Sequence, residues 1–243
     1  MPHGNLSLTQ SPVLPRPARV IDDTKHHVAL LRAIVKADTA ALHHAFAEHK
    51  TDVMQFLRFA HQHHLGAFVT WKLKHDGLIG ELPVRAVTAM RASALVSSRR
   101  TERQLFQLSQ LAELFEEDNV DALFMKGPLF AQRFYGTVDA RGFSDLDVLV
   151  RPAKDVDRID AILAGAGYQR AYRILFSRRL SRYFAHHFEY RRAGLALDLH
   201  WELQRHLSFA FDYGRISETS SRVTLEGRIY RATSDEYELV LQI

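Results

Sequence analysis

The chain has 243 residues, of which 47% are hydrophobic and 25% charged, and its formal net charge is +4. This composition is typical of a soluble globular protein with one sizeable core or two small ones. The absence of cysteine excludes disulfides, thiolate catalysis and cysteine-ligated zinc or iron–sulfur sites. No stretch has roughly 20 consecutive apolar residues, and the first residues lack the pattern of a secretory signal, so we expect a cytoplasmic protein without a membrane partner.

The residue pattern changes character along the chain. Four of the seven prolines lie near the start, where little periodicity is visible. Helical periodicity follows, with Asp52 as a helix cap and Pro83 opening a long helix, and it then gives way to alternating strands and helices. The sequence therefore predicts an α+β protein with four regions: a flexible leader (1–23), a helical N-terminal region (24–118), an α/β core (119–233), and the start of a C-terminal helix (234–243). This last helix is either continued in a longer natural chain or only a short stub.

The most informative stretch is the apolar strand pattern from Gly142 to Val150, which contains two aspartates. Because side chains alternate between the two faces of a strand, Asp145 and Asp147 emerge on the same face, while Leu146 and Val148 enter the core. Two carboxylates directed at one point can share a hard divalent cation such as Mg²⁺ or Mn²⁺.

A third carboxylate lies on another alternating strand, over residues 195–201. Its leucines share one face, and Asp198 and His200 share the other. We expect Asp198 to join the first two aspartates. His200 either contacts the acceptor or forms a hydrogen bond with an aspartate.

A lysine and a glycine separate a buried strand near 121–126 from a helix near 128–135. Pro128 is tolerated in the first turn of a helix, and Gly127 gives the backbone freedom before it. Free N–H groups at a helix start bind anions, so we expect this turn, with Lys126, to bind phosphate.

Three carboxylates supply enough oxygens for a pair of metal ions that clamps an in-line phosphoryl displacement. We expect Asp145 and Asp147 to bridge the metals. Asp198 would bind the catalytic metal and orient or deprotonate an acceptor hydroxyl. Arg141 either steadies a triphosphate or neutralises the carboxylates.

The motifs occur in an order that resembles a known family, the uncharacterised nucleotidyltransferases of the polymerase-beta-like superfamily. The residues that carry the resemblance are Lys126-Gly127, Arg141, Ser144 to Val150, Gly167-Tyr168 and Leu197 to Trp201. The resemblance implies a small mixed sheet flanked by helices. It also implies transfer of a nucleoside monophosphate from a nucleoside triphosphate to a hydroxyl, with pyrophosphate leaving.

The same resemblance implies roles for individual residues. The residues that would be catalytic and metal-binding are Asp145, Asp147 and Asp198. Those that would contact the nucleotide are Lys126, Gly127, Arg141 and Ser144. The sequence departs from the common pattern at Pro128, where Gly or Ser is usual, because proline has neither a hydroxyl nor an N–H. Lys126 can compensate as a point charge.

The acceptor stays open at this point: tRNA, a protein or peptide, a sugar and a small molecule all fit. The choice among ATP, CTP, GTP and UTP is open too. A toxin-like, tRNA-modifying transferase is one alternative, suggested by the positive charge and by the arginine-rich and aromatic-rich segment 168–183. A catalytically retired module that binds nucleotides or proteins is another, suggested by Pro128 and by the helical N-terminal region.

Overall fold

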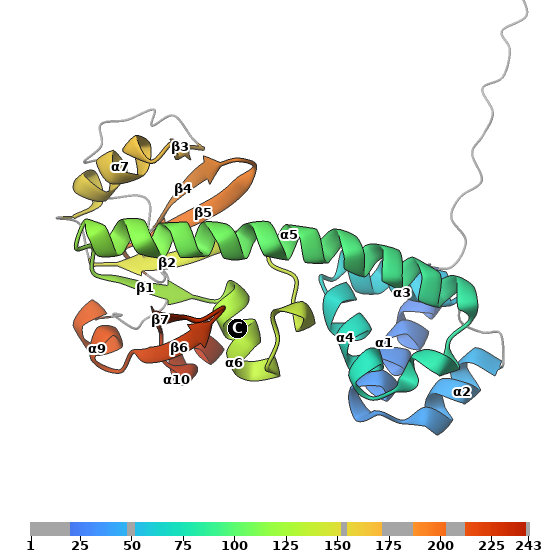
Figure 1. The fold of residues 1–243 in the computed structure, drawn as a ribbon. Coiled ribbons are helices and arrows are strands. Elements are labelled where there is room, and N and C mark those ends of the chain that lie inside the picture. The colour runs from blue at the N-terminus through green and yellow to red at the C-terminus, as the bar shows by residue number, and fades with distance from the viewer. Residues whose placement is uncertain (1–19, 48–51, 152–154, 172–186, 203–211, 242–243) are drawn as a thin grey trace, which may run out of the picture.

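The computed structural model describes residues 20–47, 52–151, 155–171, 187–202 and 212–241. Figure 1 shows a helical lobe and a lobe built on a β-sheet, with the long helix α5 (Val84–Glu117) running through both. The predicted α+β class is confirmed. Among the described residues, no helix has both the length and the apolar character needed to span a membrane.

The helical lobe is formed by α1 (Val20–Lys36), α2 (Thr39–Ala47), α3 (Val53–Gln62), α4 (Gly66–His75), the short helix η1 (Leu78–Glu81) and the first half of α5. Its core is a separate apolar cluster that includes Leu30, Ile34, Phe56, Val69 and Met90. Asp52 caps α3 as predicted, because its carboxylate accepts the Met54 N–H at 2.8 Å. Helix α1 begins at Val20, inside the predicted leader, and residues 1–19 lie outside the described part of the chain.

In the part of the chain that the structure describes, seven strands form one mixed sheet in the order β3-β4-β5-β2-β1-β7-β6. The strands are β1 (Ala122–Met125), β2 (Asp145–Val150), β3 (Gln169–Arg170), β4 (His187–Arg192), β5 (Leu195–His200), β6 (Ser221–Leu225) and β7 (Arg228–Ala232). At the centre β2 is antiparallel to β1 and parallel to β5. The N-terminal ends of β2 and β5 therefore lie beside the C-terminal end of β1, at the same end of these central strands.

The two faces of the sheet are covered by different helices. Helices α5 and α7 (Val156–Gly165) pack on one face against a large cluster that includes Leu146, Val148, Leu197 and Leu199. The opposite face carries a smaller cluster around Leu149, which α9 (Tyr213–Glu218) and the segment of α10 (Asp235–Val240) cover. Along the chain, β1 and β2 are connected by α6 (Gly127–Tyr135) and the short helix η2 (Val138–Ala140). The strand alternation predicted for residues 145–150 and 195–201 is confirmed.

The β6–β7 hairpin of this lobe was not predicted from the sequence; β7 adds to the sheet beside β1, with Phe124 opposite Ala232 in a parallel pair. Because β7 lies next to β1, the following helix α10 lies close to the turn after β1, where Glu238 contacts Lys126.

Candidate active site

The parallel pairing of β2 and β5 brings two aspartates side by side. In this register Asp147 lies opposite Asp198, and Asp145 lies opposite Ala196. On the other side of β2, Asp147 lies opposite Met125, the last residue of β1. Lys126 therefore follows directly at this end of the strands. The three aspartates are thus on one face of the sheet, opposite the face that α5 and α7 cover.

Asp147 is at the centre of this group, with a side chain that is only 7% exposed. Its Oδ1 atom lies 3.0 Å from His200 Nε2 and 3.5 Å from Lys126 Nζ. Burial raises the pKa of Asp147, but the hydrogen bond with His200 and the charge of Lys126 outweigh it and hold the pKa below its usual value. Asp147 is therefore an ionised carboxylate at neutral pH.

Asp198 has the opposite electrostatic environment. Burial and the negative charge of Asp147 raise its pKa to about 6, and Asp145 and Glu189 contribute in the same direction. The ligand atoms of Asp147, Asp198 and His200 lie within 4.8 Å of one another. Two carboxylate oxygens and an imidazole nitrogen are suitable ligands for a divalent cation, and the local excess of negative charge favours one.

Asp145 lies at the rim of the site. It is on the same strand face as Asp147, but it is not part of the group within 4.8 Å. The Ser144 hydroxyl lies 3.3 Å from its Oδ1 atom. Its charge contributes to the raised pKa of Asp198.

The turn from β1 into α6 has an unusual backbone. Lys126 has φ +50° and ψ −145°, and Gly127 has φ +46°. The first of these conformations is costly for a residue with a side chain and persists only where the surroundings hold it. Here the Lys126 N–H donates to both carboxylate oxygens of Glu238, at 2.9 and 3.0 Å. A strained turn therefore directs Lys126 and the start of α6 toward the aspartates.

A comparison with protein families bears on this arrangement. The model of the family described as uncharacterised nucleotidyltransferase matches residues 49–243. The chain belongs to this family. No curated protein matches it.

Among solved structures, this nucleotidyltransferase family member is similar to three that come from antibiotic-modifying proteins. The solution structure of the antibiotic-resistance factor ANT(2'')-Ia is 15% identical, with a TM-score of 0.42, over 57% of this chain and 69% of that chain. A crystal structure of ANT(2'')-Ia in complex with adenylyl-2''-tobramycin is 15% identical, with a TM-score of 0.39, over 58% and 78%. The lincosamide antibiotic adenylyltransferase LnuA, bound to lincomycin, is 17% identical, with a TM-score of 0.39, over 57% and 84%.

Arg141 lies against α6 in this member of the family. Its guanidinium carbon is 4.8 Å from the centroid of the Phe130 ring, one helical turn after Gly127. Arg141 and Gly142 also line a cavity of about 520 Å³ between α4, α5 and the segment around η2. A cavity of this size can hold a nucleoside or a comparable small molecule.

The sequence analysis missed two acidic residues. Glu238 is 1% exposed; it accepts from the Thr233 hydroxyl as well as from Lys126, and burial raises its pKa. Glu189 lies on β4 directly opposite Asp198, and its carboxylate accepts from Arg191 Nε at 2.8 Å. The alternating strand pattern could have revealed Glu189, because a two-residue turn at Ala193 and Gly194 pairs it with Asp198.

The segment 168–183 is only partly described, and residues 172–186 lie outside the described part of the chain. Arg170, which is described, contacts other side chains of the fold. Its guanidinium nitrogen lies 2.9 Å from the Asp160 carboxylate, and its guanidinium carbon lies 3.9 Å from the centroid of the Phe188 ring. Arg170 therefore stabilises the packing of α7 on the sheet.

Proposed function

We propose that this chain transfers a nucleoside monophosphate from a nucleoside triphosphate to an acceptor hydroxyl. The hydroxyl oxygen would form a bond to the α-phosphorus, the bond from that phosphorus to the bridging oxygen of the β-phosphate would break, and pyrophosphate would leave. The observation that supports this most is the register of Asp147 with Asp198 beside the strained turn at Lys126. Family membership supports the same reaction class.

A divalent metal ion, Mg²⁺ or Mn²⁺, fits the residues present. Asp147, Asp198 and His200 would hold one ion, and Asp145 with Asp147 would contribute to a second. The fit is chemical: burial and, after it, the neighbouring charge of Asp147 raise the pKa of Asp198, and a bound cation would offset the repulsion between the two carboxylates. When bound, such an ion would stabilise negative charge on the phosphate oxygens and on the attacking oxygen.

Lys126 and the start of α6 would bind the phosphates. The Lys126 ammonium lies 3.5 Å from Asp147, so it is held at the place where triphosphate and carboxylates would meet. The nine-residue helix α6 directs its N-terminus to the same place, which favours an anion there. Arg141, beside Phe130, and Gly127 and Ser144 would add further contacts to the nucleotide.

Asp198 would receive the proton of the acceptor hydroxyl. The support for this role is the position of Asp198 on β5, directly opposite Asp147. Before an ion binds, His200 pairs with Asp147 and would orient the Asp147 carboxylate.

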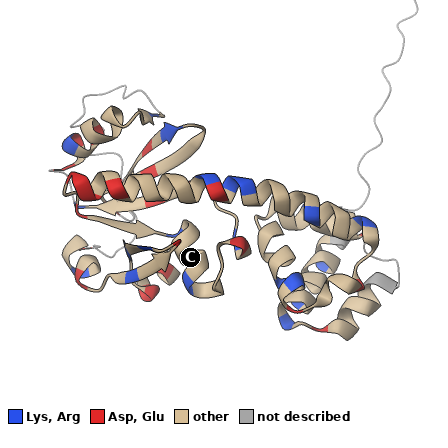
Figure 2. Cartoon of the chain, viewed as in Figure 1, with Lys and Arg blue, Asp and Glu red and all other residues tan. Residues whose placement is uncertain are grey.

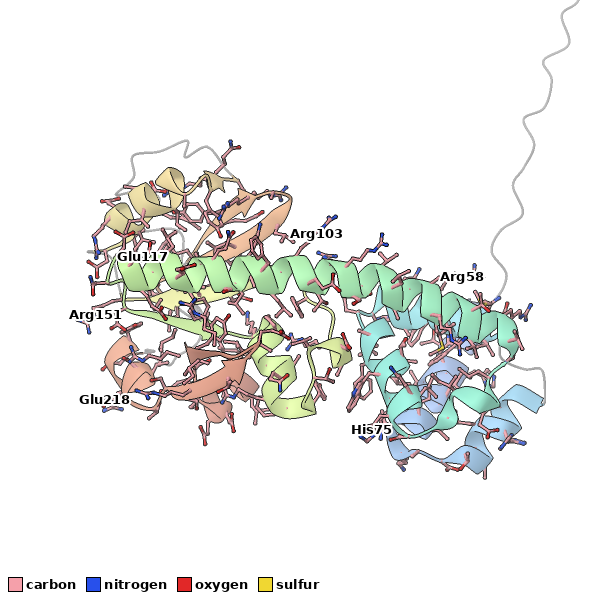
Figure 3. All side chains as sticks on the ribbon, viewed as in Figure 1. Arg58, His75, Arg103, Glu117, Arg151 and Glu218 are labelled. Atoms are coloured by element: carbon pink, nitrogen blue, oxygen red, sulfur yellow. The ribbon has the colours of Figure 1, made fainter. Side chains whose placement is uncertain are left out.

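The test is transfer of label from nucleoside triphosphates that carry ³²P at the α-position. Wild type is incubated with each triphosphate, Mg²⁺ or Mn²⁺, and a cell extract as the source of acceptors, and the labelled products are separated by size and by sensitivity to nuclease and protease. We expect wild type and Glu218→Gln to label the same product and Asp147→Asn to label none. Glu218 is an exposed residue of α9, at the other end of the sheet lobe, and so provides a matched loss of charge (Figure 3). Equal labelling by Asp147→Asn would reject the proposal, and nucleotide binding without any labelled product would favour a retired nucleotide-binding module.

A further inference from the structure

The middle of α5 carries three arginines at positions that bring them together on the helix surface. Arg99 and Arg103 are four residues apart, and Arg100 and Arg103 are three apart, so the three side chains are neighbours. All three are exposed. In Figure 2 this part of α5 is the blue band near the middle of the long helix, between the two lobes.

These arginines differ from several others in the sheet lobe. None of the carboxylates in the described ranges forms an ion pair with Arg99, Arg100 or Arg103, and the neighbouring Glu102 faces the Ser98 hydroxyl. In contrast, other arginines of this lobe are paired with acidic residues: Arg133 with Asp235, Arg151 and Arg231 with Asp121, Arg170 with Asp160, and Arg228 with Glu116. The positive charge on α5 is therefore left for an external anion.

An aromatic side chain lies next to the arginines. Phe106 is 64% exposed, and it lies seven residues after Arg99 and three after Arg103, on the same side of α5. Exposed aromatic rings beside arginines are typical of surfaces that bind single-stranded nucleic acid, because the rings stack on bases while the guanidinium groups bind phosphates. We call Arg99, Arg100, Arg103 and Phe106 the α5 stripe.

The α5 stripe has a fixed position relative to the catalytic strands. Gln107, one turn after Arg103, donates to the Arg192 carbonyl at 2.8 Å, and Gln104 donates to the Phe143 carbonyl at 3.1 Å. Both glutamines are buried, so these bonds tie α5 to the segments that lead into β5 and β2.

A hollow of about 480 Å³ lies between the stripe and the β4–β5 turn, lined by the three arginines, Val96 and residues 193–195. Arg103 lies on the side of α5 nearest this hairpin (Figure 3). Leu195 is three residues before Asp198, roughly 10 Å along an extended strand. Because α5 and the aspartates lie on opposite faces of the sheet, a bound strand would pass round the β4–β5 turn to reach Asp198. A strand of a few nucleotides can follow such a path.

We propose that the α5 stripe binds the single-stranded end of an RNA and that a hydroxyl of this RNA is the acceptor. This inference rests on the proposed function for the identity of the reaction, but the RNA-binding surface stands on the arginines and Phe106 alone. The phosphates of the strand lie on the three guanidinium groups, a base stacks on Phe106, and the terminal nucleotide extends past the β4–β5 turn toward Asp198.

The experiment measures binding of a fluorescent single-stranded RNA of about 12 nucleotides by anisotropy over a range of salt concentrations. The variant Arg99→Gln/Arg100→Gln/Arg103→Gln is compared with Arg58→Gln/Arg85→Gln/Arg222→Gln, which removes the same charge from exposed arginines elsewhere. The slope of log K against log salt should fall by about 2 in the stripe variant, since each phosphate contact to a single strand contributes about 0.7, and it should not fall in the control.

Phe106→Ala separates stacking from charge. It should weaken RNA binding by roughly tenfold without changing the salt slope, because stacking releases no counterions. If wild type does not bind the RNA, or if the stripe and control variants bind it alike, the proposal is wrong. Binding of poly-glutamate with the same affinity and the same dependence on the arginines would also reject it and would identify an acidic protein as the partner.

Two further measurements distinguish this proposal from the catalytic one. Asp147→Asn should bind the RNA like wild type, and the stripe variant should bind nucleoside triphosphates like wild type. If RNA binds through the stripe but receives no nucleotide, RNA is not the acceptor, even if the protein transfers a nucleotide to another molecule. If wild type and the stripe variant label a nuclease-resistant product at the same rate, nucleotidyl transfer would be supported and RNA would be rejected as the acceptor.

Discussion

Glu238 of α10 accepts the backbone N–H of Lys126 with both carboxylate oxygens, although the two residues are 112 positions apart. The Thr233 hydroxyl donates to the same carboxylate. This contact stabilises a residue with φ +50° at the entrance of α6, and so it holds the turn that we assign to the phosphates. The phosphate-binding geometry therefore depends on a helix that follows the catalytic strands in the sequence.

Replacing Glu238 should weaken both the fold and the nucleotide site. Glu238→Ala leaves the Lys126 N–H without its acceptor and should reduce the free energy of unfolding by about 2 kcal/mol. We expect nucleotide affinity to fall in the remaining folded protein. Glu238→Gln keeps one acceptor oxygen and should restore most of both properties. Thermal unfolding and nucleotide titration of the two variants measure this, and wild-type affinity in folded Glu238→Ala would show that the contact has no part in the site.

Asp198→Asn should stabilise the ligand-free protein at neutral pH. A folded-state pKa of about 6 lies above the ordinary value of 3.8, so ionisation of Asp198 destabilises the fold as pH rises from about 4 to about 6, and the penalty is complete above that range. Allowing for partial exposure, we expect a gain of about 1 kcal/mol, or roughly 2–4 °C, at about pH 7.5 and none near pH 4.

The check is the difference in melting temperature between wild type and Asp198→Asn at both pH values without added metal. The same variant should lose transfer activity. A melting temperature that falls at neutral pH would contradict the electrostatic account of the aspartate group.

Lys126→Met should have opposite effects on the two ligands. The lysine lies 3.5 Å from Asp147 Oδ1 and repels a cation there, so its loss should increase Mn²⁺ affinity in the absence of nucleotide. Removing a phosphate contact should at the same time lower triphosphate affinity, by about tenfold or more. Calorimetric titrations with Mn²⁺ and with triphosphate measure both effects, and Lys36→Met, at an exposed position of α1, provides a control with the same change of residue. A parallel change in the two affinities would argue against Lys126 as a phosphate-binding residue.

Most of the aspartate group could be predicted from the sequence because it follows from strand alternation. The period of two residues places Asp145 with Asp147 and Asp198 with His200, and the structure has both pairs on one face. The same rule would have found Glu189: a two-residue turn at Ala193 and Gly194 pairs residue 189 with residue 198.

Glu238 could not be found in this way. Its place depends on the parallel pairing of β7 with β1, which is a tertiary contact without a local signal. The β6–β7 hairpin itself had a signal that the sequence analysis did not use. Its strands alternate, with Val223 and Tyr230 on the buried face, and Glu226 and Gly227 both have positive φ at the turn. Even with this hairpin predicted, its partner in the sheet would have stayed open.

The most direct test of the nucleotide site is thermal unfolding with each nucleoside triphosphate, with and without Mg²⁺, because it requires no knowledge of the acceptor. Wild type, Asp147→Asn and the control Glu218→Gln are compared. A triphosphate at a hundred times its dissociation constant stabilises the fold by about 2.7 kcal/mol, which should raise the melting temperature by roughly 5–10 °C. We predict a Mg²⁺-dependent rise for at least one triphosphate in wild type and in Glu218→Gln, and its loss in Asp147→Asn. An equal rise in Asp147→Asn, or no rise with any triphosphate, would contradict the assignment of the aspartates to a metal-dependent nucleotide site.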